Sequence, residues 1–433
     1  MLETELTQLA TSIQGALTLY RVENPPITIH QVRVRRPDFS LKYHGEAALV
    51  NFEPNRIEED IWDWRDQECF QDSVVKTLPE YQSLVSALGP KAGLVQDFAR
   101  SASSASFHGT DKKELSEQVT ALGRELEDQP LPVQVRAFID GLSIEESPLV
   151  ISDRFILRQP TEEDVAQYIR LDEYGGFSHP LGDARFSVIG EFVFEVVSTG
   201  IAQREFLRTI DALRLFRVGG IVANRYEVRS RHSFLHGGVM TLSAPGRFSK
   251  FDFRLLSSDA VALNKFLHDV VPLLPDTLNL NNSATESEIA YMRYSDALFQ
   301  DRPPERAITS AMTSLEALFL EGELELTHRL AQRVSLFLRI LGTQKDARDT
   351  YDKVKRGYKI RSTFIHGGSL KAKDRPDADV LAPILLEYAR ECALVFFQLT
   401  TSKGELLRQL DRAMIDPSGV NELEASLNLV VHR

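Results

Sequence analysis

Cysteine is scarce in this 433-residue chain, which contains only Cys69 and Cys392, far apart in the sequence. Disulfide scaffolds and cysteine-based metal sites both use short, regular cysteine spacings. We therefore expect no disulfide framework and no bound metal, and a reducing cytoplasm fits best. Because 43% of the residues are hydrophobic, the chain can bury a large core, and we expect a globular protein of about two domains.

Long apolar runs are also missing. No segment offers the roughly 20 apolar residues in succession that a membrane-spanning helix needs. The N-terminus carries acidic side chains at once and lacks the basic-then-apolar order of a signal peptide. We therefore expect no membrane association.

Positive charge is not in excess, because 62 Asp and Glu outnumber 50 Lys and Arg and give a formal net charge of −12. Phosphate contacts need Lys and Arg, so this balance argues against a protein that coats nucleic acid indiscriminately. The charge is uneven, however. Residues 339–375 contain eleven Lys or Arg and four Asp, so one face of the protein is a candidate for binding a polyanion.

Several familiar catalytic motifs are absent from the sequence. It contains no phosphate-binding glycine loop, no nucleophile elbow and no zinc signature. Its carboxylates show no paired spacing typical of glycoside hydrolases. We expect no cofactor.

The first part of the chain has the pattern of a mixed α/β domain, which we place at residues 1–275. Apolar residues at every third or fourth position predict helices in the opening segment and at 115–128, while the small, polar stretch 99–113 predicts a loop. Two-residue alternation predicts half-buried strands at 27–36, 185–197, 224–230 and 250–256.

Beyond residue 275 the strand-like alternation disappears. We predict a linker at 276–289, an all-α bundle at 290–412 and a tail at 413–433. The expected fold class is therefore α+β, with a mixed α/β N-terminal domain that senses a trigger or positions a substrate. Apolar stripes place the main bundle helices after Pro303 and Pro304, at 326–341, at 345–366 and from about 379 onward.

The third of these helices has an arginine where its apolar stripe calls for an apolar residue. An always-charged guanidinium on a packing face needs a buried carboxylate or a bound anion, and Glu316 on a neighbouring predicted helix is a candidate partner for Arg361. Gly357, in the middle of the helix, allows another segment to approach closely. The apolar stripe consists of Tyr351, Val354, Tyr358 and Ile365.

A histidine follows this arginine in the last turn of the helix. Gly367 and Gly368 come next and suit the left-handed conformation that ends many helices. Five residues of α-helix place Arg361 and His366 about 140° apart and about 7.5 Å along the axis. A long arginine can still reach a phosphate near the imidazole, and a second copy of the helix can complete the site across a dimer interface. Histidine exchanges protons near neutrality, as RNA cleavage requires.

The Arg-x4-His spacing alone is not specific, since about one match is expected by chance. A second match runs from Arg231 to His236, between segments that have strand patterns. We interpret this second match as a hairpin or loop without chemistry. The match at residues 361–366 differs because it ends a periodic helix within the basic stretch.

The bundle resembles the Apea-like branch of the HEPN superfamily over roughly residues 290–410. Members of that superfamily carry Arg, four to six intervening residues and then His near the end of a bundle helix. The resemblance rests on YKIRSTFIHGG at 358–368, SLEALFLEG at 314–322 and LAQRVSLFLRILG at 330–342.

This resemblance implies a metal-independent RNA endonuclease that acts as a homodimer, often in anti-phage defence by abortive infection and in response to a phage-derived trigger. Arg361 would stabilise charge on the scissile phosphate, and His366 would transfer protons to or from the attacking 2′-hydroxyl or the leaving oxygen. Glu316 and Gly367 would support these two residues. The expected RNA-binding residues are Lys355, Arg356, Lys359 and Ser362.

Two other functions remain open at the level of the sequence. In the first alternative the bundle binds nucleic acid or a protein partner without cleaving RNA. In the second alternative the protein is a toxin-like protein that a separate antitoxin silences.

Overall fold

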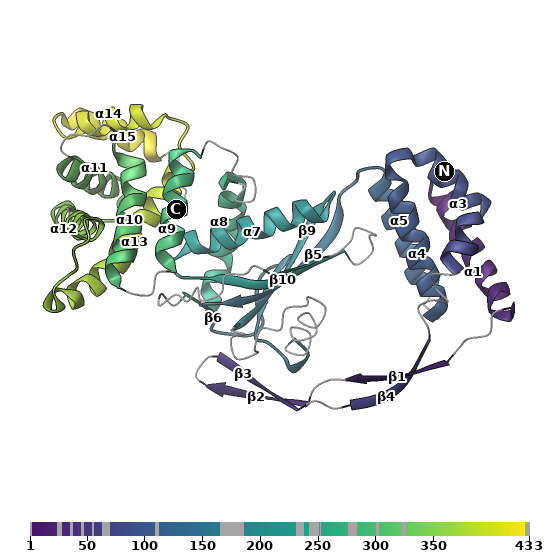
Figure 1. The fold of residues 1–433 in the computed structure, drawn as a ribbon. Helices are drawn as coiled ribbons and strands as arrows, with labels where there is room; N and C mark the ends of the chain where they lie inside the picture. Colours follow the sequence, from purple (N-terminus) through teal and green to yellow (C-terminus); the bar gives the residue numbers. More distant parts are fainter. Residues whose placement is uncertain are drawn as a thin grey trace. The chain divides into compact units, whose positions relative to one another are not determined.

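The computed structural model has an α+β fold, as the sequence predicts (Figure 1). It describes residues 2–23, 28–34, 38–44, 47–53, 56–62, 70–108, 112–164, 186–230, 238–241, 251, 253–275, 284–299, 303–321 and 326–428. The helices are α1 (Leu2–Glu23), α3 (Pro79–Leu88), α4 (Ala92–His108), α5 (Lys112–Leu126), α7 (Thr199–Phe216), α8 (Ala260–Val270), α9 (Glu286–Leu298), α10 (Pro304–Phe319), α11 (Leu326–Ile340), α12 (Ala347–Ile365), α13 (Arg375–Phe396), α14 (Lys403–Ala413) and α15 (Pro417–Asn428).

The strands are β1 (Thr28–Val34), β2 (Asp38–His44), β3 (Ala47–Glu53), β4 (Arg56–Trp62), β5 (Leu131–Asp140), β6 (Leu142–Ile144), β7 (Leu149–Ser152), β8 (Phe155–Arg158), β9 (Val188–Val196), β10 (Val222–Ser230), β11 (Gly238–Thr241) and β12 (Phe253–Leu255). Strands therefore form where the two-residue alternation predicts them at 27–36, 185–197, 224–230 and 250–256.

The chain folds into two compact units that do not follow the sequence from end to end. Unit 1 contains Met1–Phe138, Asp153–Gln203 and Arg225–Thr241. Unit 2 contains Ile139–Ser152, Arg204–Asn224 and Leu242–Arg433. The sequence pattern predicts a single domain boundary at 276–289. Unit 2 of the structure also contains segments that lie before residue 275.

Unit 1 has a helical part built on α1, α3, α4 and α5. Helix α1 buries one side of its surface at the three- to four-residue spacing that the sequence shows, and the same core includes residues from α4 and α5. The buried residues of α1 are Leu6, Leu9, Ala10, Ile13 and Leu17.

The prediction of a loop at 99–113 was wrong, because helix α4 extends through His108. Ala99, Ala102 and Ser103 are fully buried, and the Ser103 hydroxyl lies within hydrogen-bond distance of two acceptors, the carbonyl of Ala99 at 2.7 Å and Oε1 of Gln71 at 3.0 Å. Small side chains allow α4 to lie close against α1. The residues that made the segment look like a loop are therefore the ones that pack it.

The sheet part of unit 1 consists of strands in the order β11-β10-β5-β9-β8. Strands β8 and β9 pair antiparallel, with Phe155 opposite Phe192, and β10 pairs antiparallel with β11. Two further antiparallel pairs, β1 with β4 and β2 with β3, form separate two-stranded ribbons. The second Arg-x4-His match lies at 231–236, outside the described residues, and the strands on either side of it are the paired β10 and β11.

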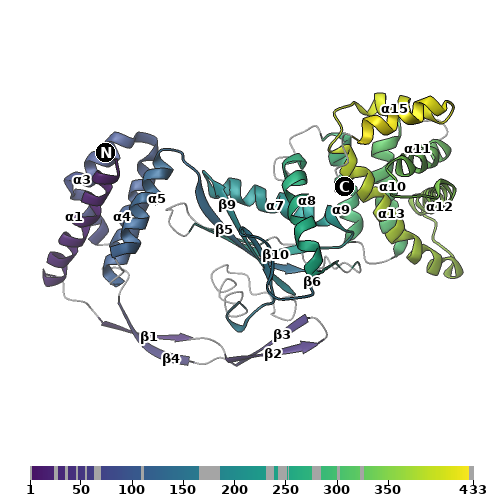
Figure 2. The same cartoon turned by 180° about the vertical axis from the view of Figure 1, so that it is seen from behind.

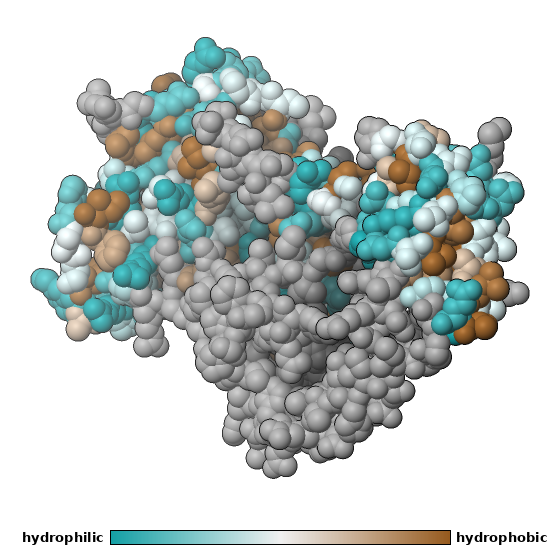
Figure 3. Space-filling view, turned by 45° about the vertical axis from the view of Figure 1, so that its right-hand side comes forward, coloured by the Kyte–Doolittle hydropathy of each residue, from teal (hydrophilic) through white to brown (hydrophobic). Residues whose placement is uncertain are grey.

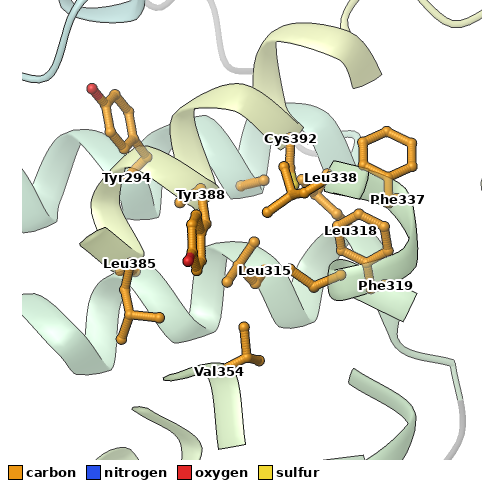
Figure 4. Packing of buried hydrophobic residues seen from close by; sticks show 14 of the residues in the cluster. Tyr294, Leu315, Leu318, Phe319, Phe337, Leu338, Val354, Leu385, Tyr388 and Cys392 are labelled. Carbon is orange, nitrogen blue, oxygen red and sulfur yellow. The ribbon is translucent and has the colours of Figure 1, made fainter. Parts of the chain in front are cut away.

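The core of unit 2 lies in the helical bundle of α9 to α14, as Figure 4 shows from close by. Helix α10 lies at its centre, next to α9, α12 and α13, and all of its apolar side chains except that of Ala317 are buried. Aromatic rings from three helices meet in the core, where Phe319 lies edge to face with Phe337 and with Phe396, and the last two rings are tilted to each other. Figure 4 labels Phe319 and Phe337 together with eight further members of the core: Tyr294, Leu315, Leu318, Leu338, Val354, Leu385, Tyr388 and Cys392.

The segment predicted as a tail, 413–433, contains helix α15, which packs against α14. Within unit 2, both views place α14 and α15 at one end of the bundle, with α11 between them and α12 (Figures 1 and 2). The bundle therefore continues past residue 412.

The surface of the described residues mixes hydrophilic and hydrophobic side chains in the view of Figure 3. None of the helices in the described part of the chain combines the length and the apolar run that crossing a membrane requires.

Candidate active site

Helix α12 carries both residues of the predicted catalytic pair, and local sequence determines where this helix begins and ends. Asp346 caps its start by accepting hydrogen bonds from the backbone amides of Arg348 and Asp349 at 2.9 and 3.0 Å. The carboxylate also suits the partial positive charge at a helix N-terminus.

The end of α12 is a Schellman motif, which the glycine pair of the sequence predicts. The amide of Gly367 donates to the carbonyl of Phe364 at 3.0 Å, and the amide of Gly368 donates to that of Thr363 at 2.9 Å. Gly367 has φ of +81°, a conformation that L side chains rarely adopt. His366 is thereby fixed as the C-cap residue, with its side chain exposed at the end of the helix.

The buried face of α12 is rotated relative to the predicted apolar stripe. Ile365, predicted on the stripe, is 51% exposed, while Val354, Gly357 and Ile360 are buried. Gly357 explains why this face is the buried one. A Cβ at this position would lie 2.6 Å from Leu385 and 2.8 Å from Met312. Its missing side chain lets α10 and α13 pack closely against this turn.

Arg361 lies at the edge of this buried face and forms the predicted ion pair. Its Nη2 is 3.0 Å from Oε2 of Glu316 on α10, and its guanidinium carbon is 5.8 Å from the centre of the Tyr358 ring. The side chain of Arg361 is 25% exposed and that of Glu316 is 15% exposed. Nε of Arg361 is buried and has no hydrogen-bond partner. The guanidinium is therefore held by Glu316 on one side, but not all of its hydrogen-bond donors have a partner.

Glu316 is held in a partly dry environment. Burial raises the pKa of its carboxyl above the usual range, and the Arg361 guanidinium opposes that rise. Removing the arginine would therefore raise this pKa further.

The imidazole of His366 has no hydrogen bond or ion pair with another described residue, and none joins it to Arg361. The two side chains share one helix and lie about 140° apart around its axis. The structure thus leaves the imidazole free for a ligand on the exposed side of α12.

The four predicted RNA-binding residues fall into two groups. Arg356 is bound to Asp377 of α13 at 2.7 Å. Lys355 and Lys359 are exposed without an ion pair to another described residue, and Ser362 is half-buried. Taking about 100° per residue, Lys355, Lys359 and Ser362 lie within about 60° of one another on the side of α12 that carries His366.

Two features near this site were not expected from the sequence. Glu305, at the start of α10, is only 2% exposed, and its Oε1 accepts from the amide of Leu370 at 3.3 Å. Its Oε2 is buried without a partner. The carboxylate therefore holds the loop that follows His366. An acidic residue after a proline pair at a helix start is so common that it gives no signal of this contact.

The second unexpected feature is a histidine–tyrosine pair. Nδ1 of His328 on α11 lies 2.8 Å from the hydroxyl of Tyr351 on α12, and the rings meet edge to face at 84°. Lys355 lies over the ring of Tyr351, with its Nζ 5.8 Å from the ring centre. The sequence places these residues 23 positions apart, so only helix packing joins them.

Comparisons of the chain with protein-family models, with curated proteins and with solved structures found no match. Among the described residues, no group of three or more His, Cys, Asp or Glu side chains is placed to hold a metal ion.

Proposed function

We propose that unit 2 is a metal-independent RNA endonuclease in which Arg361 and His366 act on one phosphodiester. The observation that carries the proposal is the half-buried Arg361, paired with Glu316 on one side and unsaturated at Nε, on the helix that ends in the exposed His366. A buried N–H without a partner costs about 1–3 kcal/mol, and a bound anion that draws the guanidinium outward relieves this cost. The resemblance to Apea-like HEPN domains supports the same roles.

The reaction uses the RNA's own nucleophile. The 2′-hydroxyl attacks the adjacent phosphorus, the bond to the 5′-oxygen of the next nucleotide breaks, and the products end in a 2′,3′-cyclic phosphate and a 5′-hydroxyl. His366 accepts the 2′-hydroxyl proton or returns a proton to the leaving oxygen. Arg361 stabilises the negative charge that develops on the phosphoryl oxygens. A second copy of the chain, facing the first, would supply the other proton-transfer group.

Cleavage of labelled RNA in the presence of chelator tests this proposal. We expect wild type to form cyclic-phosphate products, and Arg361→Ala and His366→Ala to cleave at least about 100-fold more slowly. His268→Ala is a matched control, because His268 is an exposed histidine on α8. DNA of the same sequence should resist cleavage, since it lacks the nucleophile. Equal rates for wild type and both site variants would refute the proposal.

The biological role that we propose is RNA cleavage in anti-phage defence by abortive infection. It rests on the resemblance alone. A phage challenge of cells that express wild type or His366→Ala tests it, with loss of protection expected for the variant.

A further inference from the structure

One side of α12 forms a continuous line from His366 back to Tyr351, along which Lys355, Lys359 and His366 are exposed and Ser362 and Tyr351 are half-buried. Taking about 100° per residue, Tyr351, Lys355, Lys359, Ser362 and His366 all lie within about 80° of one another. The buried positions, Val354, Gly357 and Ile360 among them, centre on the opposite side of the helix. The line spans 15 residues, or about 22 Å at about 1.5 Å per residue.

This line has the composition of a track for a nucleic-acid strand. Two exposed lysines occupy its middle, and neither forms an ion pair with another described residue. Three other cations of α12 lie off the line and are paired, because Arg356 binds Asp377, Lys353 binds Asp349 and Arg361 binds Glu316. Positive charge that is free to meet phosphate therefore concentrates on the side of α12 that carries His366.

The far end of the line offers an aromatic surface. The ring of His328 is exposed, and its hydrogen bond to Tyr351 fixes the imidazole edge-on to the tyrosine ring. A ring held in one orientation loses little conformational entropy when a base stacks on it. Unpaired RNA bases stack on His, Tyr, Phe and Trp side chains, whereas bases within a duplex are already stacked and paired.

We infer that the exposed face of α12 binds single-stranded RNA, with the His328–Tyr351 pair as a base-stacking subsite about 22 Å from His366. At about 3.4 Å per nucleotide along a stacked strand, the track covers about six nucleotides, and fewer if the strand is extended. Lys355 and Lys359 contact the phosphates between the two ends. This inference deepens the proposed function and rests on it for the class of ligand.

Binding of an eight-nucleotide RNA with methylated 2′-hydroxyls tests the inference without cleavage, because the nucleophile is blocked. By fluorescence anisotropy we expect His328→Ala to weaken binding about 10-fold, in line with the loss of one stacked base. His328→Phe keeps a flat ring and should bind within about twofold of wild type. Tyr351→Phe frees the imidazole and should give an intermediate loss.

The matched control is Arg408→Ala, which removes an exposed positive charge from α14. It should bind this RNA within about twofold of wild type, since Arg408 lies off α12 and already pairs with Glu405 of its own helix. An RNA duplex of the same length should bind at least about 10-fold more weakly, because its bases are unavailable for stacking. A trinucleotide is too short to cover the whole track. The double variant Lys355→Ala with His328→Ala should therefore weaken its binding much less than it weakens the binding of the eight-nucleotide RNA.

The inference fails if His328→Ala binds the single strand like wild type, if Arg408→Ala weakens binding as much, or if the duplex binds as tightly. Its failure is distinguishable from that of the proposed function. If RNA binding depends on His328 but the unmodified RNA is not cleaved, the proposed nuclease function is refuted and the proposed RNA-binding track is supported. If cleavage depends on Arg361 and His366 but RNA binding does not depend on His328, the track is refuted and the nuclease function is supported.

Discussion

Two arginines of the same bundle occupy packing faces, yet they are held in different ways. Arg333 on α11 is 2% exposed, and it forms two hydrogen bonds with Asp411 of α14 and donates a third to the carbonyl of Phe319, at distances from 2.6 to 2.8 Å. Arg361 has one ion pair, an unpartnered Nε and a quarter of its side chain exposed. Every part of the Arg333 guanidinium serves the fold, whereas part of Arg361 remains available to an anion.

Burial of an arginine therefore does not by itself indicate a structural or a functional role. The number of unsatisfied donors separates the two cases, because a protein that buries a charge for stability alone satisfies its hydrogen bonds. Replacing each arginine by methionine, an apolar residue of similar length, tests this reading directly.

The largest effect is expected on catalysis. Arg361→Met should lower the rate of RNA cleavage at least about 100-fold, since it removes the group that we propose to stabilise the phosphoryl charge. Its free energy of unfolding should change by only about 1 kcal/mol, because the pair is partly exposed and the carboxyl of Glu316 can take up a proton. Cleavage assays measure the rate, and chemical denaturation of the same preparation measures the free energy of unfolding. A stable variant that cleaves RNA normally would make Arg361 structural, like Arg333.

The opposite pattern is expected for the other arginine. Arg333→Met should lower the free energy of unfolding by about 2–4 kcal/mol, because it breaks a buried network and leaves the carbonyl of Phe319 without its partner. The rate of cleavage per folded molecule should not change. Urea denaturation provides the measurement. Loss of activity in fully folded Arg333→Met would erase the distinction between the two sites.

A smaller effect is expected from the glycine that brings α12 close to its neighbours. Gly357→Ala should destabilise the protein by about 1–3 kcal/mol, because the added methyl would overlap Leu385 and Met312. Gly15→Ala in α1 is the matched control, since a Cβ there meets nothing within 4 Å and should stabilise the helix by up to about 1 kcal/mol. If both variants have equal stability, the close packing at Gly357 does not set the position of α12.

The smallest effect concerns pH. A carboxyl whose pKa is higher in the folded state than in the unfolded state makes the folded protein bind more protons. Its contribution to stability is full below its pKa in the unfolded state, and this contribution is lost as pH rises through its pKa in the folded state. Burial already raises the pKa of Glu316, and Arg361→Met removes the opposing charge. The stability of Arg361→Met should therefore fall more steeply than that of wild type as pH rises from acid toward neutrality.

Denaturation curves at a series of pH values provide the measurement, and the double variant Arg361→Met with Glu316→Gln should lose this extra slope. A steeper slope that persists in the double variant would assign the pH dependence to another group.

Much of unit 2 could be predicted because its signals are local. The apolar spacing along 304–319 and 326–340 gave the helices, Gly367 and Gly368 gave the Schellman end, and an arginine on a packing face gave its pairing with Glu316. The helix at 99–108 was missed because its small alanine and serine side chains form no clear apolar stripe, and serine is also common in turns. The strand pattern identified β-structure but not the strand order or the division into two units.

Local sequence is enough to predict the periodicity of the main bundle helices, the glycine-terminated end of α12 and the presence of a guanidinium and an imidazole near that end, since each depends on residues within a few turns. Only the tertiary structure decided which side of α12 is buried, that Glu305 holds the loop after His366 and that His328 meets Tyr351. These contacts depend on how closely two helices approach, and that distance is set by shapes such as Gly357 against Met312, which no single segment contains.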